Sequence, residues 1–266
     1  MTADQLVDTE IEVTARGLPA PLWRPLLSAA EELPDLGEPA MVVVVVPHPD
    51  DETLGAGGLL HRLTAAGTPV TVVFVTDGAA GYPGCDPDQT RELARIRRDE
   101  ALAALATLGV AADRAVFLDV PDGEVSGAAE LELAQRLGPL LAGHRTGLCL
   151  APWPLDPHPD HQAVGRAAVA ATAAAGVTLW QYPIWMRHSV QPDDPRVEVD
   201  RLRVLRLSTG ERSAKLAAVA THASQVRSPF PGYGPVLPDH VLDLFADGHE
   251  PFFVPADTTD ESGSSA

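Results

Sequence analysis

Two short segments of the chain carry residue types that bind metal ions. His48 and Asp51 are three residues apart in one segment, and His158 and His161 are three residues apart in the other. Two imidazoles and one carboxylate make a three-ligand site with open positions, which is the arrangement that a catalytic zinc requires. The sequence therefore predicts a metal site, although spacing alone leaves open which three of the four candidates bind.

The alternative interpretation is that these are ordinary polar loop residues. Two of the nine histidines fall within one four-residue segment, and Pro47 and Pro49 stiffen the turn that carries the first motif. Both segments also follow runs that are typical of buried strands. These three observations favour a metal site over solvated loops.

Asp50 and Asp51 are neighbours in the first motif. Adjacent carboxylates in a tight turn point in different directions, so one can bind a metal while the other acts on water. A metal lowers the pKa of bound water to about 7, and a nearby carboxylate can then remove its proton as nucleophilic attack begins. The pair is thus suited to hydrolysis.

Apolar runs alternate with helical patterns along the chain, and this alternation predicts the fold class. Continuous apolar runs typical of buried parallel strands alternate with helices that end at glycines. We expect one α/β domain, doubly wound, with a mostly parallel central sheet and helices on both faces, whose ligand site lies at the carboxyl ends of the strands. The expected strands are 41–46, 70–76, 115–118, 147–151, 177–182 and 201–207. The first expected helix follows the segment 47–52 and runs to about residue 66. The other expected helices are 90–108, 128–141, 161–175 and 211–224, the last with Ser208 and Glu211 spaced as a capping box.

The domain is expected to span residues 41–255. Residues 1–40 contain several prolines and scattered acids and predict an arm packed on the domain. Residues 256–266 are small, polar and acidic, which predicts a disordered tail.

Composition excludes several classes of partner. The chain has 45% hydrophobic and 21% charged residues, as a globular protein does, and its net charge is 19 − 37 = −18. This charge repels nucleic acid, and Lys215 is the only lysine. Cys85 and Cys149 make no disulfide framework, and the longest apolar run, 41–46, is too short to span a bilayer. We therefore expect a soluble cytoplasmic protein with no membrane insertion, whose oligomeric state stays open.

The motifs resemble those of a known family, the PIG-L/LmbE-like zinc-dependent N-deacetylases. The resemblance rests on the segments Pro47–Gly55, Thr76–Gly78 and His158–His161, and it extends through Arg95–Gly109, Leu118–Gly123 and Lys215–Gln225. It implies a Rossmann-like fold and removal of an acetyl group from N-acetylglucosamine-type amino sugars, either in conjugates or in natural products.

The resemblance also implies roles for individual residues. His48, Asp51 and His161 would bind zinc, with ferrous iron as the other possible metal. Asp50 would be the general base, and His158 would be the cation or acid that stabilises the oxyanion. Attack on an amide builds negative charge on the carbonyl oxygen, so a metal and a protonated histidine would both oppose that charge.

Two further aspartates have two interpretations each. Asp160 either orients or tunes a histidine from behind, as metal sites usually require, or is a plain helix N-cap. Asp77 either hydrogen-bonds sugar hydroxyls or only closes an Asp-Gly turn. The resemblance favours the site for Asp77.

Candidates for substrate contact lie on two helices. Arg91, Arg95 and Arg98 form one helical stripe, which by default is a solvated, salt-bridged face. Because the family binds substrate partly through an arginine on this helix, Arg95 or Arg98 becomes a candidate. His222 is either a packed helical histidine or a substrate contact, which the resemblance to a His-x-Ser-Gln motif supports.

The chain departs from the family at one position. Some relatives carry a tyrosine just before the second histidine motif, where this chain has Asp156 and Pro157. Tyr82 could substitute as an oxyanion donor or sit in a mobile lid. The aromatic stretch 180–185 could stack on a sugar ring, although such residues more often pack.

The sequence thus predicts a metal-dependent hydrolase that removes an N-acetyl or other N-acyl group from an N-acetylglucosamine-type sugar or its conjugate, a small-molecule substrate. One alternative is a metal- or sugar-binding protein of the same fold without turnover. Another is an amidase acting on a different N-acylated natural product. A two-histidine-one-carboxylate iron oxygenase fits the ligand types but has no support from the resemblance.

Overall fold

The computed structural model describes residues 16–37, 39–142 and 147–256. Most of the predicted tail, 256–266, and the first fifteen residues of the predicted arm, 1–40, lie outside these described residues.

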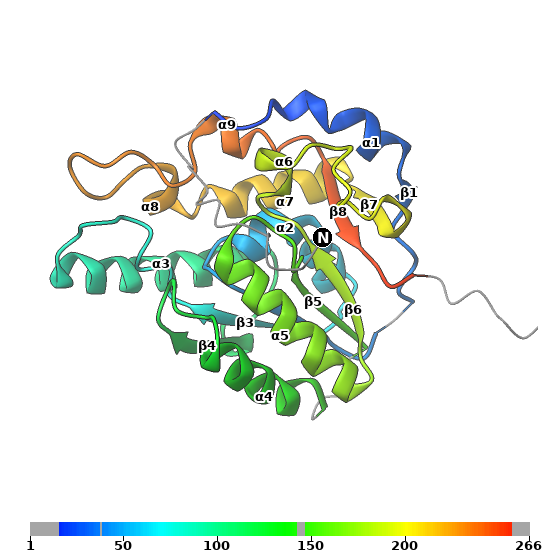
Figure 1. The fold of residues 1–266 in the computed structure, drawn as a ribbon, viewed down its shortest axis with the longest axis horizontal. Helices are drawn as coiled ribbons and strands as arrows, with labels where there is room; N and C mark the ends of the chain where they lie inside the picture. Colours follow the sequence, from blue (N-terminus) through cyan, green and yellow to red (C-terminus); the bar gives the residue numbers. More distant parts are fainter. Residues whose placement is uncertain (1–15, 38, 143–146, 257–266) are drawn as a thin grey trace, which may run out of the picture.

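A single sheet of eight strands organises the described chain, in the order β1-β7-β8-β6-β5-β2-β3-β4 (Figure 1). All neighbouring strands are parallel except β8, which is antiparallel to β6 and β7. The strands are β1 (Glu31–Glu32), β2 (Val42–Val46), β3 (Val70–Thr76), β4 (Ala115–Val120), β5 (Leu148–Pro152), β6 (Thr178–Tyr182), β7 (Leu202–Arg206) and β8 (His249–Phe253). The helices are α1 (Arg24–Ala29), α2 (Asp51–Ala65), α3 (Pro87–Thr107), α4 (Ala128–Ala142), α5 (Pro159–Ala175), α6 (Met186–Ser189), α7 (Thr209–Val219), α8 (Ala223–Val226) and α9 (Asp239–Leu242).

The valine run of β2 supplies both faces of the core. Val42, Val44 and Val46 pack into the layer that contains α2, α3 and α7. Val43 and Val45 pack into the opposite layer, which contains α4 and α5. Successive side chains of a strand point to opposite faces, so an unbroken β-branched run requires helices on both sides. The predicted doubly wound α/β fold is confirmed.

The order of the strands reverses at β2. The chain proceeds from β2 through β3 to β4 on one side, and then returns to place β5 on the other side of β2. Crossover connections leave in opposite directions at such a point, which opens a crevice at the carboxyl ends of the two strands. The two histidine motifs follow β2 and β5, so the topology brings both to this crevice.

Several elements differ from the sequence prediction, which includes none of the short elements β1, α1, α6 and α9. The strand β8 was not predicted, because it is short and contains Pro251, which cannot donate to a ladder. It pairs along its length with β7 but meets β6 only at Gln181. The predicted helix 211–224 is divided into α7 and α8, although its predicted capping box, in which the hydroxyl of Ser208 accepts the N–H of Glu211, is confirmed.

The described part of the N-terminal segment packs on the sheet. Trp23 and Leu27 are fully buried in a third apolar cluster, which also contains Trp153 and Phe253. The short strand β1 extends the sheet beside β7. Residues 20–32 therefore contribute to the core of the fold.

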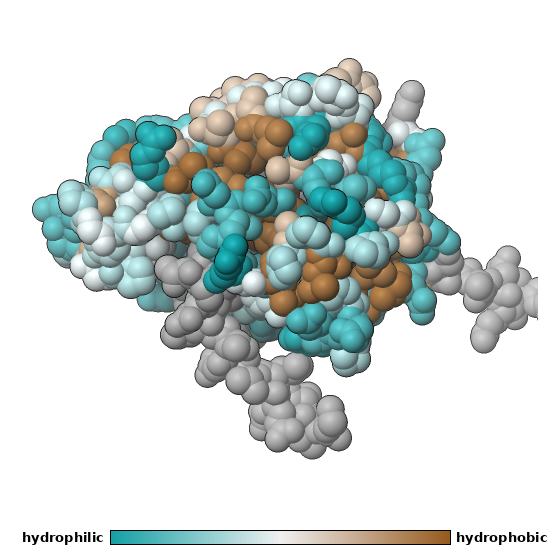
Figure 2. Space-filling view, turned by 90° about the horizontal axis from the view of Figure 1, so that it is seen from above, coloured by the Kyte–Doolittle hydropathy of each residue, from teal (hydrophilic) through white to brown (hydrophobic). Residues whose placement is uncertain are grey.

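The surface mixes polar and apolar residues. Figure 2 shows several separate apolar patches among polar residues on the face seen from above, as expected because apolar atoms contribute much of any folded protein's surface. In the described ranges, no helix combines the length and the apolar character needed to cross a bilayer.

Candidate metal centre

The first histidine motif forms the turn between β2 and α2. The carbonyl oxygen of Pro47 accepts hydrogen bonds from the N–H and the hydroxyl of Thr76, which ties the turn to β3. The N–H of His48 donates to Oδ2 of Asp51 over 3.0 Å, and the N–H of Asp51 donates to the carbonyl of His48 over 3.3 Å. These reciprocal bonds keep the His48 and Asp51 side chains close together.

The second histidine motif forms the start of α5. His158 is the N-cap residue, and its Nδ1 accepts the backbone N–H of Asp160. The interpretation of Asp160 as N-cap is therefore wrong. A Cβ on Gly165 would lie 2.7 Å from the carbonyl oxygen of Pro152, so this glycine lets α5 pack tightly against the end of β5 and brings His161 to the sheet edge.

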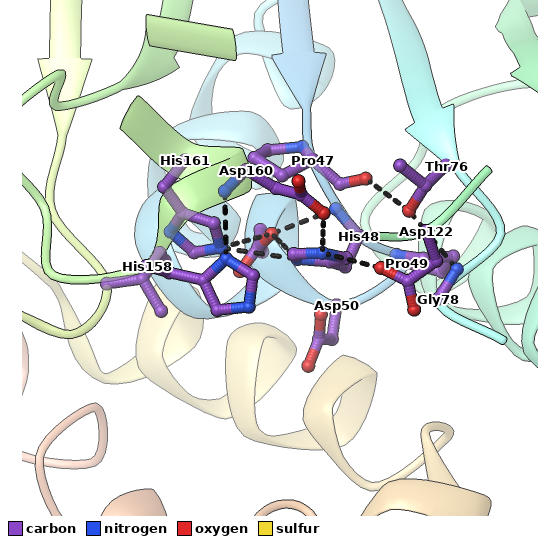
Figure 3. Close-up of polar contacts among 12 residues, drawn as sticks. Pro47, His48, Pro49, Asp50, Thr76, Gly78, Asp122, His158, Asp160 and His161 are labelled. Carbon is purple, nitrogen blue, oxygen red and sulfur yellow. Dashed lines mark hydrogen bonds and ion pairs between the residues drawn. The ribbon is translucent and has the colours of Figure 1, made fainter. Parts of the chain in front are cut away.

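Three donor atoms from the two motifs form a nearly equilateral triangle (Figure 3). Nδ1 of His48 and Nε2 of His161 are 3.2 Å apart, and each lies 3.3 Å from Oδ2 of Asp51. In a tetrahedral site with metal–ligand bonds of about 2.0–2.1 Å, neighbouring donors are about 3.3–3.4 Å apart. The triangle therefore fits one divalent ion. His48, His158 and His161 also form a group in which one ring nitrogen of each lies within 4.8 Å of the others, which makes His158 an alternative third ligand.

Carboxylates lie behind both histidines of the triangle. Nε2 of His48 is 3.1 Å from Oδ1 of Asp122 and 3.3 Å from Oδ2 of Asp160. Nδ1 of His161 is 3.2 Å from Oδ1 of Asp156. A carboxylate on the far nitrogen of a metal-binding imidazole selects its tautomer and orients its ring, so the remaining nitrogens are free to face an ion.

The neighbouring charges in the triangle favour the charged forms of its two histidines and of its aspartate. Burial lowers the pKa of His161, but Asp51 and Asp156 outweigh burial and raise it to about 9. Burial likewise lowers the pKa of His48, and Asp122 with Asp160 and Asp51 brings it well above its usual value. Burial raises the pKa of Asp51, but the two histidines hold it well below its usual range. The negative charge in this pocket therefore attracts a cation.

Asp50 lies beside the triangle without joining it (Figure 3). Its side chain is buried, and the residue is only 5% exposed. Burial and the neighbouring Asp51 carboxylate raise its pKa to about 7, against the lowering influence of Arg97 and the two histidines. A carboxylate that titrates near neutrality suits a general base.

The charge state of His158 differs from the one that the resemblance implies. Burial lowers its pKa to about 3, and the nearby charges of His161 and His48 act in the same direction. The ring is therefore neutral at pH 7, whereas the resemblance implied a cation or an acid. Because Nδ1 accepts the N–H of Asp160, the proton of the neutral ring resides on Nε2, where it can be donated as a hydrogen bond.

On α3, the arginine that lies near the site is not one of the two that were expected there. Arg95 is exposed and pairs with Glu92 and Asp99, and Arg98 pairs with Asp119. Neither reaches the histidine cluster. The side chain that turns inward on α3 is that of the intervening arginine, Arg97.

Arg97 is 3% exposed, and its Nε and Nη2 have no hydrogen-bond partner among the described residues. Glycines make room for it, because a Cβ on Gly78 would lie 2.2 Å from Nη1 and one on Gly81 2.6 Å from Nη2. Its charge also acts on the pKa values of Asp50 and Asp122. A buried guanidinium with unused donors is a candidate contact for a polar ligand.

Other predicted residues lie at or near the site. Oδ1 of Asp77 accepts the N–H of Ala79, which closes the Asp-Gly turn. His222 is buried, with Nε2 3.3 Å from the hydroxyl of Thr53 at the start of α2. Burial and Arg97 lower the pKa of His222 to about 3.

Aromatic residues near the site have structural partners. Tyr82 is buried and donates its hydroxyl to the carbonyl of Ser224 over 2.6 Å, so it is neither a lid residue nor a free oxyanion donor. Tyr182 donates its hydroxyl to the carbonyl of Val45 over 2.7 Å. Trp180 and Trp185 are buried in the core, which agrees with packing.

Sequence reasoning gave no site role to Asp122, Asp156 or Arg97. The only available signal for Asp122 was its turn, Pro121–Gly123, which follows a strand end. The only signal for Asp156 is that Asp156 and Pro157 stand where some relatives carry a tyrosine. Arg97 lay between two arginines that helical periodicity places together, and periodicity cannot reveal which face of α3 meets the pocket.

Comparison with known proteins identifies the family of this chain. A family model described as GlcNAc-PI de-N-acetylase (PIG-L) matches residues 43–172. The diacetylchitobiose deacetylase of Thermococcus kodakarensis is 30% identical over 197 residues, covering 69% of each chain. The 1D-myo-inositol 2-acetamido-2-deoxy-alpha-D-glucopyranoside deacetylase of Kineococcus radiotolerans is 26% identical over 259 residues, covering 72% of this chain and 70% of the relative.

A solved structure supports the same relationship. The crystal structure of a conserved protein from Thermus thermophilus superposes with a TM-score of 0.60 at 29% identity, covering 85% of this chain and 99% of that one. The matched region includes both histidine motifs, and this chain belongs to the PIG-L/LmbE-like GlcNAc-PI de-N-acetylase family.

Proposed function

We propose that the protein is a metal-dependent hydrolase that removes the acetyl group from an N-acetylglucosamine-type amino sugar. The observation that carries this proposal is the donor triangle of His48, Asp51 and His161, with the buried carboxylate of Asp50 beside it. Three ligands leave a coordination position open for chemistry. The relatives named as deacetylases support this reaction class.

His48, Asp51 and His161 would hold the ion, which we propose to be Zn²⁺, with Fe²⁺ as the other ion that this donor set accepts. A divalent ion there would supply positive charge that acidifies water and polarises an amide carbonyl. Asp122, Asp160 and Asp156 would keep both imidazoles in the binding orientation.

Asp50 would act as the general base. Its carboxylate would take a proton from the attacking water while the water oxygen bonds to the amide carbon. The same proton would then pass to the nitrogen as the carbon–nitrogen bond breaks, leaving acetate and a free amine. Its pKa of about 7 supports both proton acceptance and proton return near neutral pH.

His158 and Arg97 would act on the substrate as hydrogen-bond donors. The Nε2–H of neutral His158 would stabilise the charge that develops on the amide oxygen. The unused donors of Arg97 would bind a sugar hydroxyl or another polar group of the substrate. We propose Arg97 for this contact in place of Arg95 or Arg98, because Arg97 is buried and its charge acts on Asp50, whereas those two pair with exposed acids.

The substrate is proposed to be a small, uncharged N-acetylated sugar. The two relatives are named for diacetylchitobiose and for an inositol glycoside of N-acetylglucosamine. The net charge of −18 disfavours strongly anionic substrates, since the field of the protein repels them.

The proposal is tested by acetate release. Protein stripped with a chelator and reloaded with Zn²⁺, or with Fe²⁺ under anaerobic conditions, is incubated with N-acetylglucosamine and N,N'-diacetylchitobiose. Acetate and free amine are measured by mass spectrometry. Asp50→Asn should lower kcat by about 10²–10⁴ with bound metal unchanged, and His161→Ala should weaken metal binding.

Asp113→Asn is the matched control, because Asp113 is exposed in the turn Ala112–Arg114. This control should retain full activity. Activity that survives complete metal removal, or full turnover by Asp50→Asn, would contradict the proposal.

A further inference from the structure

The peptide unit that joins Pro49 to Asp50 has an unusual conformation. Asp50 has a φ of 157°, and apart from glycine only Asp119 shares a positive φ among the described residues. Such backbone is strained for a residue with a side chain, and it persists only where the surrounding structure holds it. Rotation of this peptide would move the Asp50 carboxylate relative to the donor triangle.

Two side chains hold this peptide, one at each end. The carbonyl oxygen of Pro49 accepts a hydrogen bond from Nε2 of Gln225, and the N–H of Asp50 donates to Oε2 of Glu52 over 3.2 Å. Glu52 is two residues from Asp50 in the sequence. Gln225 lies in α8, 176 residues from Pro49 in the sequence. Together they prevent the peptide from turning over.

The segment that carries Gln225 is itself firmly anchored. Gln225 is 1% exposed, and its carbonyl accepts the N–H of Leu237 over 2.9 Å. The N–H and hydroxyl of Ser224 both donate to the carboxylate of Glu100 on α3, each over 2.7 Å. The hydroxyl of Tyr82 donates to the carbonyl of Ser224. The amide of Gln225 is thus presented to Pro49 from a fixed support.

We propose that Gln225 is a positioning residue that holds the Pro49–Asp50 peptide, and thereby the Asp50 carboxylate, in the geometry needed for proton transfer. This inference rests on the proposed role of Asp50. Gln225 is 1% exposed, and its side-chain amide donates to the backbone carbonyl of Pro49, so it would act through the backbone. The chain breaks between α7 and α8, and Gln225 lies in α8 next to Ser224, which is bonded to Glu100.

A positioning role has a kinetic consequence that a general stabilising role lacks. Displacement of a base by about 1 Å can cost about 10²-fold in rate. The Pro49 carbonyl is not one of the three donor atoms of the triangle, and it already accepts the Gln225 amide. Loss of the Gln225 amide should therefore lower kcat while KM and metal affinity are retained.

The test uses Gln225→Met in the full chain, because methionine matches glutamine in length but cannot donate a hydrogen bond. Gln181→Met is the matched control: Gln181 is also buried and accepts a bond from Arg201, but it lies in β6. Gln225→Met should lower kcat about 100-fold with KM within twofold. Hydrogen–deuterium exchange of the amides in residues 50–54 should rise at least tenfold in Gln225→Met and remain unchanged in Gln181→Met.

Gln225→Leu is a second variant whose side chain also lacks a hydrogen-bond donor, and it should reproduce both effects. Because exchange needs no substrate, this measurement tests the inference even if the protein releases no acetate from any sugar. Unchanged exchange at residues 50–54 in both variants would overturn the inference. So would an equal loss of kcat in Gln181→Met, or a loss confined to KM or metal affinity.

Discussion

The carboxylates behind the two triangle histidines determine which ring nitrogen carries the proton and which can bind a metal. An imidazole binds a metal through one nitrogen only when the other carries the proton. Asp156 is fully buried, and its Oδ2 accepts the N–H groups of Ile184 and Trp185, so its Oδ1 is held toward His161. The residue that replaces a tyrosine of some relatives is thus part of the support of the proposed metal site.

Asp156→Asn should lower metal affinity by about 10–100-fold, because the amide cannot stabilise the same imidazole orientation and charge. Competition with a chromophoric chelator measures the affinity. Asp113→Asn serves as a control, and a circular dichroism spectrum checks that the fold is retained. Equal affinities for wild type and Asp156→Asn would show that Asp156 does not orient His161.

At the scale of elements, a buried ion pair forms hydrogen bonds with the backbone of α2. Nζ of Lys215 on α7 donates to the carbonyl of Leu54 and to Glu250 on β8. The carboxylate of Glu250 accepts the N–H groups of Gly58 and Leu59. The only lysine of the chain therefore fastens α2, whose first turn carries Asp51, to both α7 and β8.

Lys215→Met should lower the free energy of unfolding by about 3–5 kcal/mol, because it leaves the buried charge of Glu250 without its partner. Urea denaturation measures this quantity. The double variant Lys215→Met/Glu250→Gln should recover part of the loss. Arg62→Met, which removes an exposed ion pair with Glu211, should change it by less than about 1 kcal/mol. A loss no larger in Lys215→Met than in Arg62→Met would contradict a structural role for the pair.

Glu211, in the first turn of α7, should make the stability of the fold depend on pH. The hydrogen bond from Arg62 lowers the pKa of Glu211 to about 2, with the N–H and hydroxyl of Ser208 acting in the same direction against burial. A pKa depressed by folding adds stability that is complete above the ordinary value of about 4.5. That stability is lost as the pH falls through about 2.

The difference in unfolding free energy between wild type and Glu211→Gln should therefore be constant above about pH 5 and shrink steadily below about pH 4.5. Urea titrations at a series of pH values measure it. A difference that grows toward acid pH would refute the assignment.

At the scale of the whole molecule, the proposed metal would join the two halves of the sheet. His48 and Asp51 follow β2, His161 follows β5, and the strand order reverses between these strands. An ion held by all three would cross-link the chain at its topological switch point. Such binding favours the folded state, because the unfolded chain has no such site.

Removal of metal by a chelator should lower the Tm, and a metal concentration of 100 times Kd should add about 2.7 kcal/mol to the unfolding free energy. Differential scanning calorimetry with and without metal measures the shift. His161→Ala should show no such increment. A Tm that does not respond to metal in the wild type would contradict the proposed ligand set.

Much of the fold could be predicted from the sequence, because its signals are local. A β-branched run such as Val42–Val46 has few alternatives to a doubly buried strand, and β3 is found where its apolar run indicated. The capping box at Ser208 and the family resemblance likewise depend on residues close together in the chain. The spacing of His48, Asp51, His158 and His161 predicts a candidate metal site, and the structure brings these four residues close together.

Only the tertiary structure decided which side chains surround that site. The inward direction of Arg97, the carboxylates Asp122 and Asp156 behind the histidines, and the hold of Gln225 on Pro49 all join segments far apart in sequence. Strand β8 was not predicted for a related reason. Its sequence contains Pro251, and it forms a strand by pairing with β7, which is distant in the sequence. Periodicity and motif spacing report the intrinsic preference of each segment, whereas contacts between segments depend on how all of them pack at once.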